Sequence, residues 1–348
     1  MSEVTAFKKS EKLSEDITKI TEDEIRPDDV FEAFLSLCAE DAESFFRADD
    51  FMDVACPGCA SADVEDHFVK HAFKYNHCGS CGSLYVSPRP TPAAMERYYR
   101  DSKSQLFWFE EVLKKTGKQR KAKIMLPNVN RVGGILESLG AKPACALDVG
   151  SANGAFLTEW QKQHPDTKLL GIEPGPESAQ KCRDLGITVF EGMVEDEAAK
   201  PEVEGDLVTC FEVIEHVQNM DRFAKAMYDV TAKDGVAILS GLGADGFDIQ
   251  ILWEKSRSLM PPHHLNFLSI KGMKTLFSKV GFKKVDVITP GRLDVQIVKK
   301  SIERGVVPTR MSHFEKLLLS KDQEVLDALQ KFLADNKLSS HVWLICQK

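Results

Sequence analysis

The stretch "ACALDVGSANGAFLTEW", residues 144–160, carries the pattern that decides the fold. An apolar run ends at a single acid, Asp148, and Gly150 and Gly154 follow before a helical pattern begins. The first glycine allows a sharp turn off a strand, and the second lets backbone approach a ligand closely. In doubly wound sheets, ligands bind beyond the carboxyl ends of the strands. The stretch therefore predicts a binding site, and its acid favours a ligand with a cationic head over a diphosphate.

Short apolar runs and helical patterns alternate along the rest of the chain. This alternation predicts βαβ units and a parallel sheet. The fold class we expect is α/β: a doubly wound, mostly parallel seven-stranded sheet, with a small N-terminal zinc-binding domain and a helical insertion before the last strand. The predicted strands are 144–149, 168–173, 188–191, 206–211, 236–241, 284–289 and the final run "SSHVWLICQ". The predicted units are a flexible N-terminus (1–26), a helical lead-in with the cysteine module (27–100), a helical linker (101–140) and the sheet domain (141–348), with the insertion at 291–337.

Two C-x-x-C pairs, "CPGC" and "CGSC", stand eighteen residues apart in the N-terminal part. Two such pairs at this separation are typical of a zinc site with four thiolate ligands. Four thiolates fill a tetrahedral coordination sphere, so no position is left for an activated water and the predicted role is structural. Iron or a redox pair remains the alternative. The predicted ligands are Cys56, Cys59, Cys78 and Cys81.

Composition narrows the classes of function. The chain has 348 residues, a formal net charge of −8 and no apolar run near the ~20 residues that span a bilayer. The first residues lack the apolar core of a signal peptide, and scattered cysteines suit a reducing compartment, so we expect a cytoplasmic protein without a membrane span. The negative charge disfavours a nucleic-acid partner. A basic cluster at 114–123 is either a solvated helix face or a rim that meets an anionic substrate.

The segment "LDVGSANGAFL" resembles motif I of class I S-adenosylmethionine-dependent methyltransferases, and the resemblance extends through about residues 144–290. It implies that S-adenosylmethionine is the cofactor. In that family the acid after the second strand, here Glu173 in "LLGIEPG", binds the ribose hydroxyls. The segment "FEGMVED" corresponds to the part that cradles adenine, and "DLVTCFEVIEHV" to the motif after the fourth strand. The implied cofactor-binding residues are Asp148, Gly150, Ser151, Asn153, Gly154, Glu173, Met193, Val194, Phe211 and Glu212.

The cysteine module, the following "GSLYVSPRPT" and the methyltransferase pattern together resemble bacterial sugar and surface-polysaccharide methyltransferases. The implied activity is O- or C-methylation of a sugar or glycan-linked small molecule. In "PPHHLNFLS", His264 matches the family's base histidine, and His263 replaces a glutamate of the family pattern. His216 is a third candidate catalytic residue, although a structural role at a helix start is favoured for it. Glu212 and Glu215 are interpreted as positioning residues.

Two other functions remain open at this stage. A zinc-ribbon rRNA methyltransferase would share the same motifs, but the stretch "SADVEDHFVKHAFKYNH" is poor in basic residues. A non-catalytic protein could bind the cofactor and use the cysteine module and the insertion for partner proteins. The Asn/Asp-Pro-Pro-Tyr motif of enzymes that methylate nucleobase nitrogens is absent after the fourth predicted strand, which argues against that chemistry.

Overall fold

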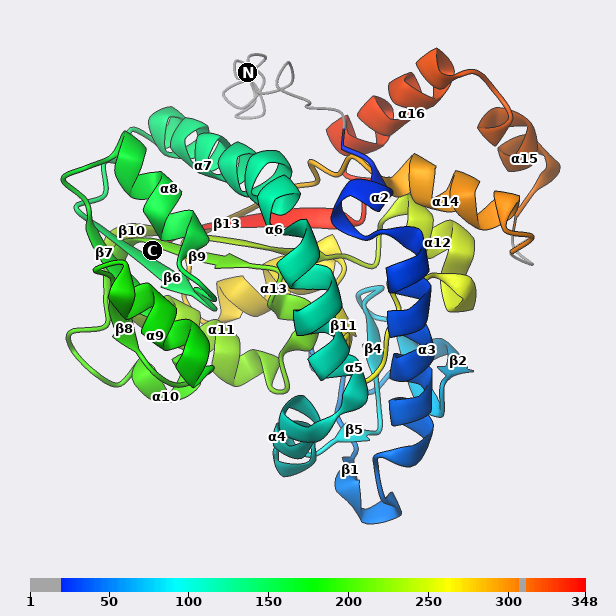
Figure 1. The fold of residues 1–348 in the computed structure, drawn as a ribbon, viewed down its shortest axis with the longest axis horizontal. Coiled ribbons are helices and arrows are strands. Elements are labelled where there is room, and N and C mark those ends of the chain that lie inside the picture. The colour runs from blue at the N-terminus through cyan, green and yellow to red at the C-terminus, as the bar shows by residue number, and fades with distance from the viewer. Residues whose placement is uncertain (1–19, 307–310) are drawn as a thin grey trace.

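A seven-stranded sheet forms the centre of the computed structural model, which describes residues 20–306 and 311–348 (Figure 1). The strands lie in the order β12-β13-β10-β9-β6-β7-β8, and β13 is antiparallel to both of its neighbours. This arrangement confirms the predicted mostly parallel sheet, including the last strand joining it. Their bounds are β6 Cys145–Val149, β7 Lys168–Ile172, β8 Thr188–Phe190, β9 Gly205–Phe211, β10 Thr231–Leu242, β12 Lys284–Ile288 and β13 His341–Gln347. Strand β10 begins five residues before the predicted start because a bulge between Thr231 and Val236 extends the pairing.

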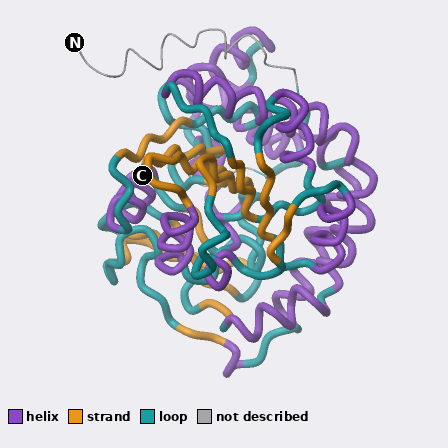
Figure 2. The backbone as a smooth tube through the Cα atoms, turned by 90° about the vertical axis from the view of Figure 1, so that its left-hand side faces the viewer, coloured by secondary structure: helices purple, strands orange, loops and turns teal. Residues whose placement is uncertain are grey.

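Helices cover both faces of this sheet because alternate strand residues are apolar on both sides. On one face, Ala146, Leu207 and Trp343 pack with side chains of α7 (Leu126–Leu139), α8 (Ala155–Gln163) and α9 (Pro176–Asp184). On the other face, Leu147 and Val208 pack with α10 (Val194–Glu197), α11 (Met220–Val230) and α13 (Ile270–Lys279). Figure 2 shows the strands between helices on either side. Among the described residues, no helix is both long and apolar enough to cross a membrane.

The cysteine module forms a second, antiparallel sheet, and a strand from the segment between β10 and β12 completes it. Strands β2 (Val64–Lys70), β3 (Phe73–Cys78) and β4 (Leu84–Val86) pair in sequence order, and β11 (Asn266–Phe267) completes the sheet beside β4. Asn266 lies opposite Tyr85, and Phe267 lies opposite Leu84. A two-stranded pair, β1 (Phe51–Met52) and β5 (Arg89–Pro90), flanks this sheet. The segment with His263 and His264 therefore leads directly into a strand of the sheet of the cysteine module.

A long helical stretch connects the two halves. Helix α4 (Pro92–Asp101) is capped by Thr91, whose side chain accepts a hydrogen bond from the N–H of Ala94. The chain then continues through α5 (Lys103–Phe107), α6 (Lys114–Arg120) and α7, joined by wide π-type turns at η3 (Trp108–Leu113) and η4 (Lys121–Met125). Figure 1 shows a change of direction between α6 and α7. Pro127 cannot donate to the carbonyl of Lys123, which instead accepts a hydrogen bond of 2.9 Å from Arg292 Nη2.

The N-terminal helices pack beside the insertion. Of the stretch predicted to be flexible, residues 1–19 lie outside the described residues, and the rest includes the short helix α2 (Glu22–Ile25). Helix α3 (Asp28–Ser44) and the turn η2 (Ala48–Asp50) follow. The insertion contains α14 (Asp294–Glu303), α15 (His313–Leu319) and α16 (Gln323–Asp335), while α12 (Phe247–Leu252) and η6 (Trp253–Lys255) precede the histidine segment.

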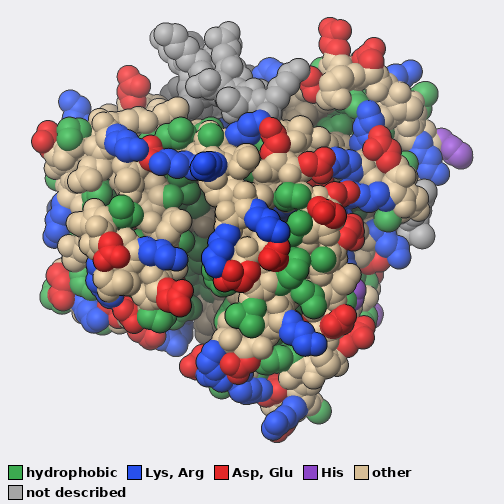
Figure 3. All heavy atoms as spheres, viewed as in Figure 1, with side chains coloured by type: hydrophobic (Ala, Val, Ile, Leu, Met, Phe, Trp, Pro, Cys, Tyr) green, Lys and Arg blue, Asp and Glu red, His purple; other side chains and the backbone are tan. Residues whose placement is uncertain are grey.

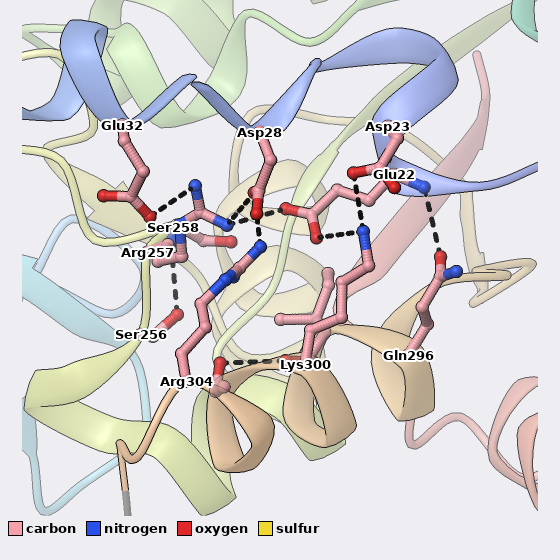
Figure 4. Close-up of polar contacts among 12 residues, drawn as sticks. Glu22, Asp23, Asp28, Glu32, Ser256, Arg257, Ser258, Gln296, Lys300 and Arg304 are labelled. Carbon is pink, nitrogen blue, oxygen red and sulfur yellow. Dashed lines mark hydrogen bonds and ion pairs between the residues drawn. The ribbon is translucent and has the colours of Figure 1, made fainter. Parts of the chain in front are cut away.

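An ion-pair network joins α2 and α3 to α14 and to the loop after η6 (Figure 4). Arg257 lies 3.5 Å from Glu22, 3.3 Å from Asp28 and 3.0 Å from Glu32, and its guanidinium stacks 4.6 Å from the centre of the Phe31 ring. Lys300 and Arg304 on α14 pair with acids of the same two helices. Glu22 is buried, so its charge is tolerated because Arg257 and Lys300 face it. The network fixes the loop that carries Arg257. The next residue in this loop, Ser258, accepts a hydrogen bond from His264.

We predict that Arg257→Met lowers the free energy of unfolding by roughly 3 kcal/mol, the low end for a broken buried pair, because Glu22 loses a partner while Asp28 and Glu32 stay half exposed. Urea unfolding measures the change. The control is Lys331→Met, which removes an exposed pair with Asp335 and should cost about 0.5 kcal/mol or less. If both variants lose the same free energy of unfolding, the network stabilises the protein no more than an exposed ion pair does.

Candidate active site

The loop after β6 has the conformation that its glycines permit. Gly150 and Gly154 have φ angles of +73° and +72°, and Ala152 between them also has a positive φ, +47°. A Cβ atom on Gly154 would lie 2.7 Å from Ile187 Cδ1, and one on Gly150 would lie 3.0 Å from Val213 Cγ2. Both glycines are therefore required by backbone conformation and by close packing. The loop turns tightly over the end of the strand, and α8 begins directly after it.

Two carboxylates lie at this loop. Asp148 is buried, and its Oδ1 accepts a 2.7 Å hydrogen bond from the Thr209 hydroxyl. Burial, with a contribution from the charge of Glu173, raises the pKa of Asp148 to about 7. The two oxygens of Glu173 accept 2.8 Å bonds from the backbone N–H groups of Ala152 and Gly175. Within the described part of the chain, neither carboxylate has a cationic side chain at ion-pair distance, so both favour a ligand that brings a positive charge.

The other predicted cofactor residues divide into two groups. Ser151 in the loop and Val194 at the start of α10 are buried, whereas Asn153 and Met193 are exposed. Phe211, by contrast, packs between the rings of Phe156 and Trp343 at the end of β9.

Glu212 turns away from this loop toward β10 and β13. Its φ is +56°, and its Oε1 accepts a 2.6 Å bond from the Ser240 hydroxyl and lies 2.9 Å from His341 Nε2. Burial alone would raise the pKa of Glu212, but His341 and Ser240 outweigh it and lower the pKa to about 2. Glu212 is therefore a carboxylate with a lowered pKa that lies against the Ser240 hydroxyl and the His341 ring.

Two of the three candidate histidines, His216 and His264, lie side by side. His216 lies in η5 (Ile214–His216), just after β9, and His264 lies in the loop before β11; their ring centres are 4.8 Å apart. Nitrogens of both rings and a carboxylate oxygen of Glu215 lie within 4.8 Å of one another. Burial, with the neighbouring His216, lowers the pKa of His264 well below its usual value, so this imidazole is neutral near pH 7. His263 lies elsewhere, with its Nε2 2.8 Å from the Tyr98 hydroxyl.

The sequence predicts only a positioning role for Glu215, but the structure places its carboxylate beside His216 and His264. It is 2% exposed, and its Oε2 has no hydrogen-bond partner within the described residues. Burial and the charge of Glu212 raise its pKa well above the usual value, and Arg26 offsets part of this effect. The signal in the sequence was the adjacent Glu-His pair just after the fourth predicted strand. Only the fold could show that His264, 48 positions after His216, joins them.

Charged and aromatic residues of the N-terminal half interact electrostatically with the acids near this cluster. Burial raises the pKa of Tyr99, and so does the charge of Glu215. Burial and the charge of Arg26 lower the pKa of Arg120 to about 10, while Glu212 opposes this. In Figure 3 the surface is hollowed between the α8–α9 side and the α5–α6 side.

The four cysteines of the two C-x-x-C pairs also converge. Sγ atoms are 3.5 Å apart between Cys56 and Cys81 and 3.6 Å apart between Cys59 and Cys78, and all four lie within 4.8 Å of one another. Zn–S bonds of about 2.3 Å in a tetrahedron place the sulfurs about 3.8 Å apart. Disulfides would need about 2.05 Å. The donor set and its spacing therefore fit a four-thiolate zinc site.

Comparison with known proteins identifies the class. Residues 117–287 match the family model of a methyltransferase domain. The chain therefore contains a class I S-adenosylmethionine-dependent methyltransferase domain, and the matched residues include strands β6 to β10 of the central sheet. It is accordingly an S-adenosylmethionine-dependent methyltransferase.

Several solved structures are similar to parts of the chain at low sequence identity. A plantazolicin methyltransferase, BamL, in complex with a desmethyl-plantazolicin analogue and SAH, is 11% identical over 73% of this chain and 93% of its own, with a TM-score of 0.47. A SAM-dependent methyltransferase from Archaeoglobus fulgidus is 15% identical over 70% and 99%, with a TM-score of 0.46. A possible histamine N-methyltransferase from Thermotoga maritima is 15% identical over 73% and 98%, with a TM-score of 0.44.

The raised pKa of Asp148 predicts that the free energy of unfolding depends on pH. The folded protein retains this proton up to about pH 7, whereas an unfolded aspartate loses it near pH 3.9, so the stability contributed by the protonated form falls as the pH rises between these values. Asp148→Asn keeps an acceptor for Thr209 without the titration. Its free energy of unfolding should exceed that of the wild type by up to roughly 4 kcal/mol at pH 8, and by less at pH 5.

Denaturant unfolding across this pH range measures the difference. The control is Asp166→Asn, which changes an exposed aspartate and should leave the pH dependence as in the wild type. If the curves of Asp148→Asn and the wild type run parallel from pH 5 to pH 8, Asp148 is ionised in the folded protein and this account of its environment is wrong.

Proposed function

We propose that this chain transfers a methyl group from S-adenosylmethionine to an oxygen or carbon of a sugar or glycan-linked small molecule. The observation that carries the proposal is the meeting of Glu215, His216 and His264 just beyond β9, close to the loop where a sulfonium would be held. Basic and polar groups at that point are what an acceptor needs to lose a proton.

The cofactor site that we propose is the loop after β6 together with the end of β7. Glu173 supplies negative charge for the cationic cofactor, and Asp148 adds to it once the bound cation favours loss of its proton. Each Glu173 oxygen uses one lone pair for a backbone N–H and keeps another for a ribose hydroxyl. Ser151, Asn153 and the two glycines shape the loop, while Met193 and Val194 lie where adenine would pack.

The reaction is an in-line displacement. The acceptor atom attacks the methyl carbon, the carbon–sulfur bond breaks, and its electron pair stays on sulfur as S-adenosylhomocysteine forms. A hydroxyl acceptor must also lose its proton. The Nδ1 of His264 donates to the Ser258 carbonyl over 2.7 Å, so Nε2 carries a free lone pair. We infer that His264 accepts that proton or orients the acceptor, and that His263, held by Tyr98, positions the loop.

The remaining parts of the proposal concern substrate and metal. Arg26, whose charge acts on Glu215, and Arg120, which interacts with Glu212, suit an acceptor with anionic groups, such as a sugar phosphate. The formal net charge of −8 disfavours an RNA acceptor. The four cysteines are proposed to hold a structural zinc ion, which stabilises the sheet that includes β11.

Transfer of labelled methyl from S-adenosylmethionine tests the function. The purified chain is incubated with separate pools of sugar nucleotides, glycan precursors, rRNA and peptides, and the products are identified by mass spectrometry. The proposal expects label in a sugar. Label in rRNA or peptide alone would refute the sugar acceptor and identify another class of acceptor. Binding of the cofactor without methyl transfer to any pool would favour the non-catalytic alternative.

We predict that His264→Asn lowers kcat by about 10²- to 10⁴-fold while the affinity for S-adenosylmethionine changes little. The asparagine amide can still donate to the Ser258 carbonyl, so the loop keeps its main anchor. Turnover assays and calorimetry measure the two quantities. The matched control is Glu173→Ala, which should weaken cofactor binding instead. Activity within a few-fold of the wild type would show that His264 takes no part in the reaction.

A further inference from the structure

We propose that Glu215, His216 and His264 form a second metal site, which binds a divalent first-row transition-metal cation with two imidazoles and one carboxylate. The site differs in place and chemistry from the four-cysteine cluster. Its use in catalysis rests on the proposed function, but the binding of the cation does not.

The hydrogen bonds of the two histidines leave one ligand atom free on each ring. His216 Nδ1 lies 2.8 Å from the carbonyl oxygen of His263, and His264 Nδ1 lies 2.7 Å from that of Ser258. A carbonyl oxygen only accepts, so each Nδ1 carries the hydrogen and each Nε2 carries a lone pair. A histidine that donates one ring N–H to a backbone carbonyl and offers its other nitrogen is the usual arrangement of a metal ligand.

The carboxylate lacks the partner that such a buried group needs. Glu215 Oε2 is buried without a hydrogen bond, and no Lys or Arg of the described residues lies at ion-pair distance from the side chain. A Cβ atom on Gly241 of β10 would lie 2.7 Å from this oxygen, so a larger residue there would displace it. A buried carboxylate normally pairs or coordinates a metal. A cation bound to both Nε2 atoms would supply the missing partner.

Backbone contacts hold the three ligands in one rigid unit. The N–H of Leu265, next to His264, donates to the carbonyl of Glu215 over 2.7 Å. Asn266 Nδ2 donates to the carbonyls of Ile214 and Val217, which flank the other two ligands in the chain. The loop before β11 and the turn after β9 are thus fixed against each other. Rigid backbone of this kind is what sets the geometry of a metal site.

The donor set selects the type of cation. Two imidazoles and one carboxylate suit Zn²⁺, Fe²⁺ or Co²⁺ better than Mg²⁺, which prefers oxygen ligands. Three protein ligands leave at least one position open, unlike four thiolates. An acceptor hydroxyl in the open position would become more acidic and lose its proton to water; its oxygen would then attack the methyl carbon. His264 would then act by holding the cation, because its lone pair is no longer free to take the proton.

Cobalt binding to the full chain tests the site. The protein is stripped of metal, reloaded with Co²⁺, and the bound metal is counted by elemental analysis and absorption. We expect two equivalents: one with thiolate-to-cobalt charge-transfer bands, from the cysteine cluster, and one without them. Glu215→Gln and His216→Asn should each lose the second equivalent and keep the first. The asparagine can still donate to the His263 carbonyl, and retained thiolate bands show that each variant is folded.

The matched control is His67→Asn, which changes an exposed histidine outside both clusters and should keep both equivalents. A wild type that binds Co²⁺ only through thiolates, or variants that retain two equivalents, would overturn the proposal. The outcomes also separate the metal site from the proposed function. If the protein binds a second equivalent of cobalt but methylates no sugar, the metal site stands and the proposed function is refuted. If it methylates a sugar while it binds a single metal ion, the proposed function stands and the second metal site is refuted.

Discussion

The pairing of β11 with β4 is the contact on which the candidate active site depends. It joins two residues of the methyltransferase half, Asn266 and Phe267, to the sheet of the cysteine module. Around this pairing, Val86 donates to the carbonyl of Leu265 over 2.9 Å, and the Tyr75 hydroxyl donates to the carbonyl of His264 over 2.8 Å. The histidine loop is therefore held from the side of the cysteine module as well as from the turn after β9. A loop fixed by both parts keeps its side chains in one orientation.

Arg89 strengthens the same junction from within. It is 1% exposed, and its guanidinium donates to the side chain of Asn266 and to the carbonyls of Val86 and Gln218. A buried guanidinium is costly unless its donors are satisfied, and here three of its nitrogens are. From the cysteine cluster, the carbonyl of Cys81 accepts a bond from the Ser269 hydroxyl, two residues after β11. Order at the cysteine cluster is thus transmitted to the histidine loop through a few short hydrogen bonds.

Features with local signals in the sequence could be predicted, whereas contacts between residues far apart in the sequence could not. The sheet was predictable because its signals are local: apolar runs of strand length, helical periods between them, and glycines after β6. The convergence of the four cysteines was predictable because their spacing is characteristic. By contrast, the partner of Arg89 is 177 positions away, and β11 contains only two residues, too few for any pattern. The ion pair between α2 and Arg257, and the convergence of Glu215 with His264, arise only after folding.

Hydrogen–deuterium exchange tests most directly whether the cysteine module holds the histidine loop. The exchange of amides in residues 263–269 is compared before and after the metal is removed from the four-cysteine cluster by a chelator, with cofactor affinity measured in parallel. The account predicts that these amides lose protection together with β3 and β4, while the loop after β6 still binds S-adenosylmethionine. If the histidine segment stays protected after β4 has lost its protection, the loop is held by the methyltransferase half alone and the account is contradicted.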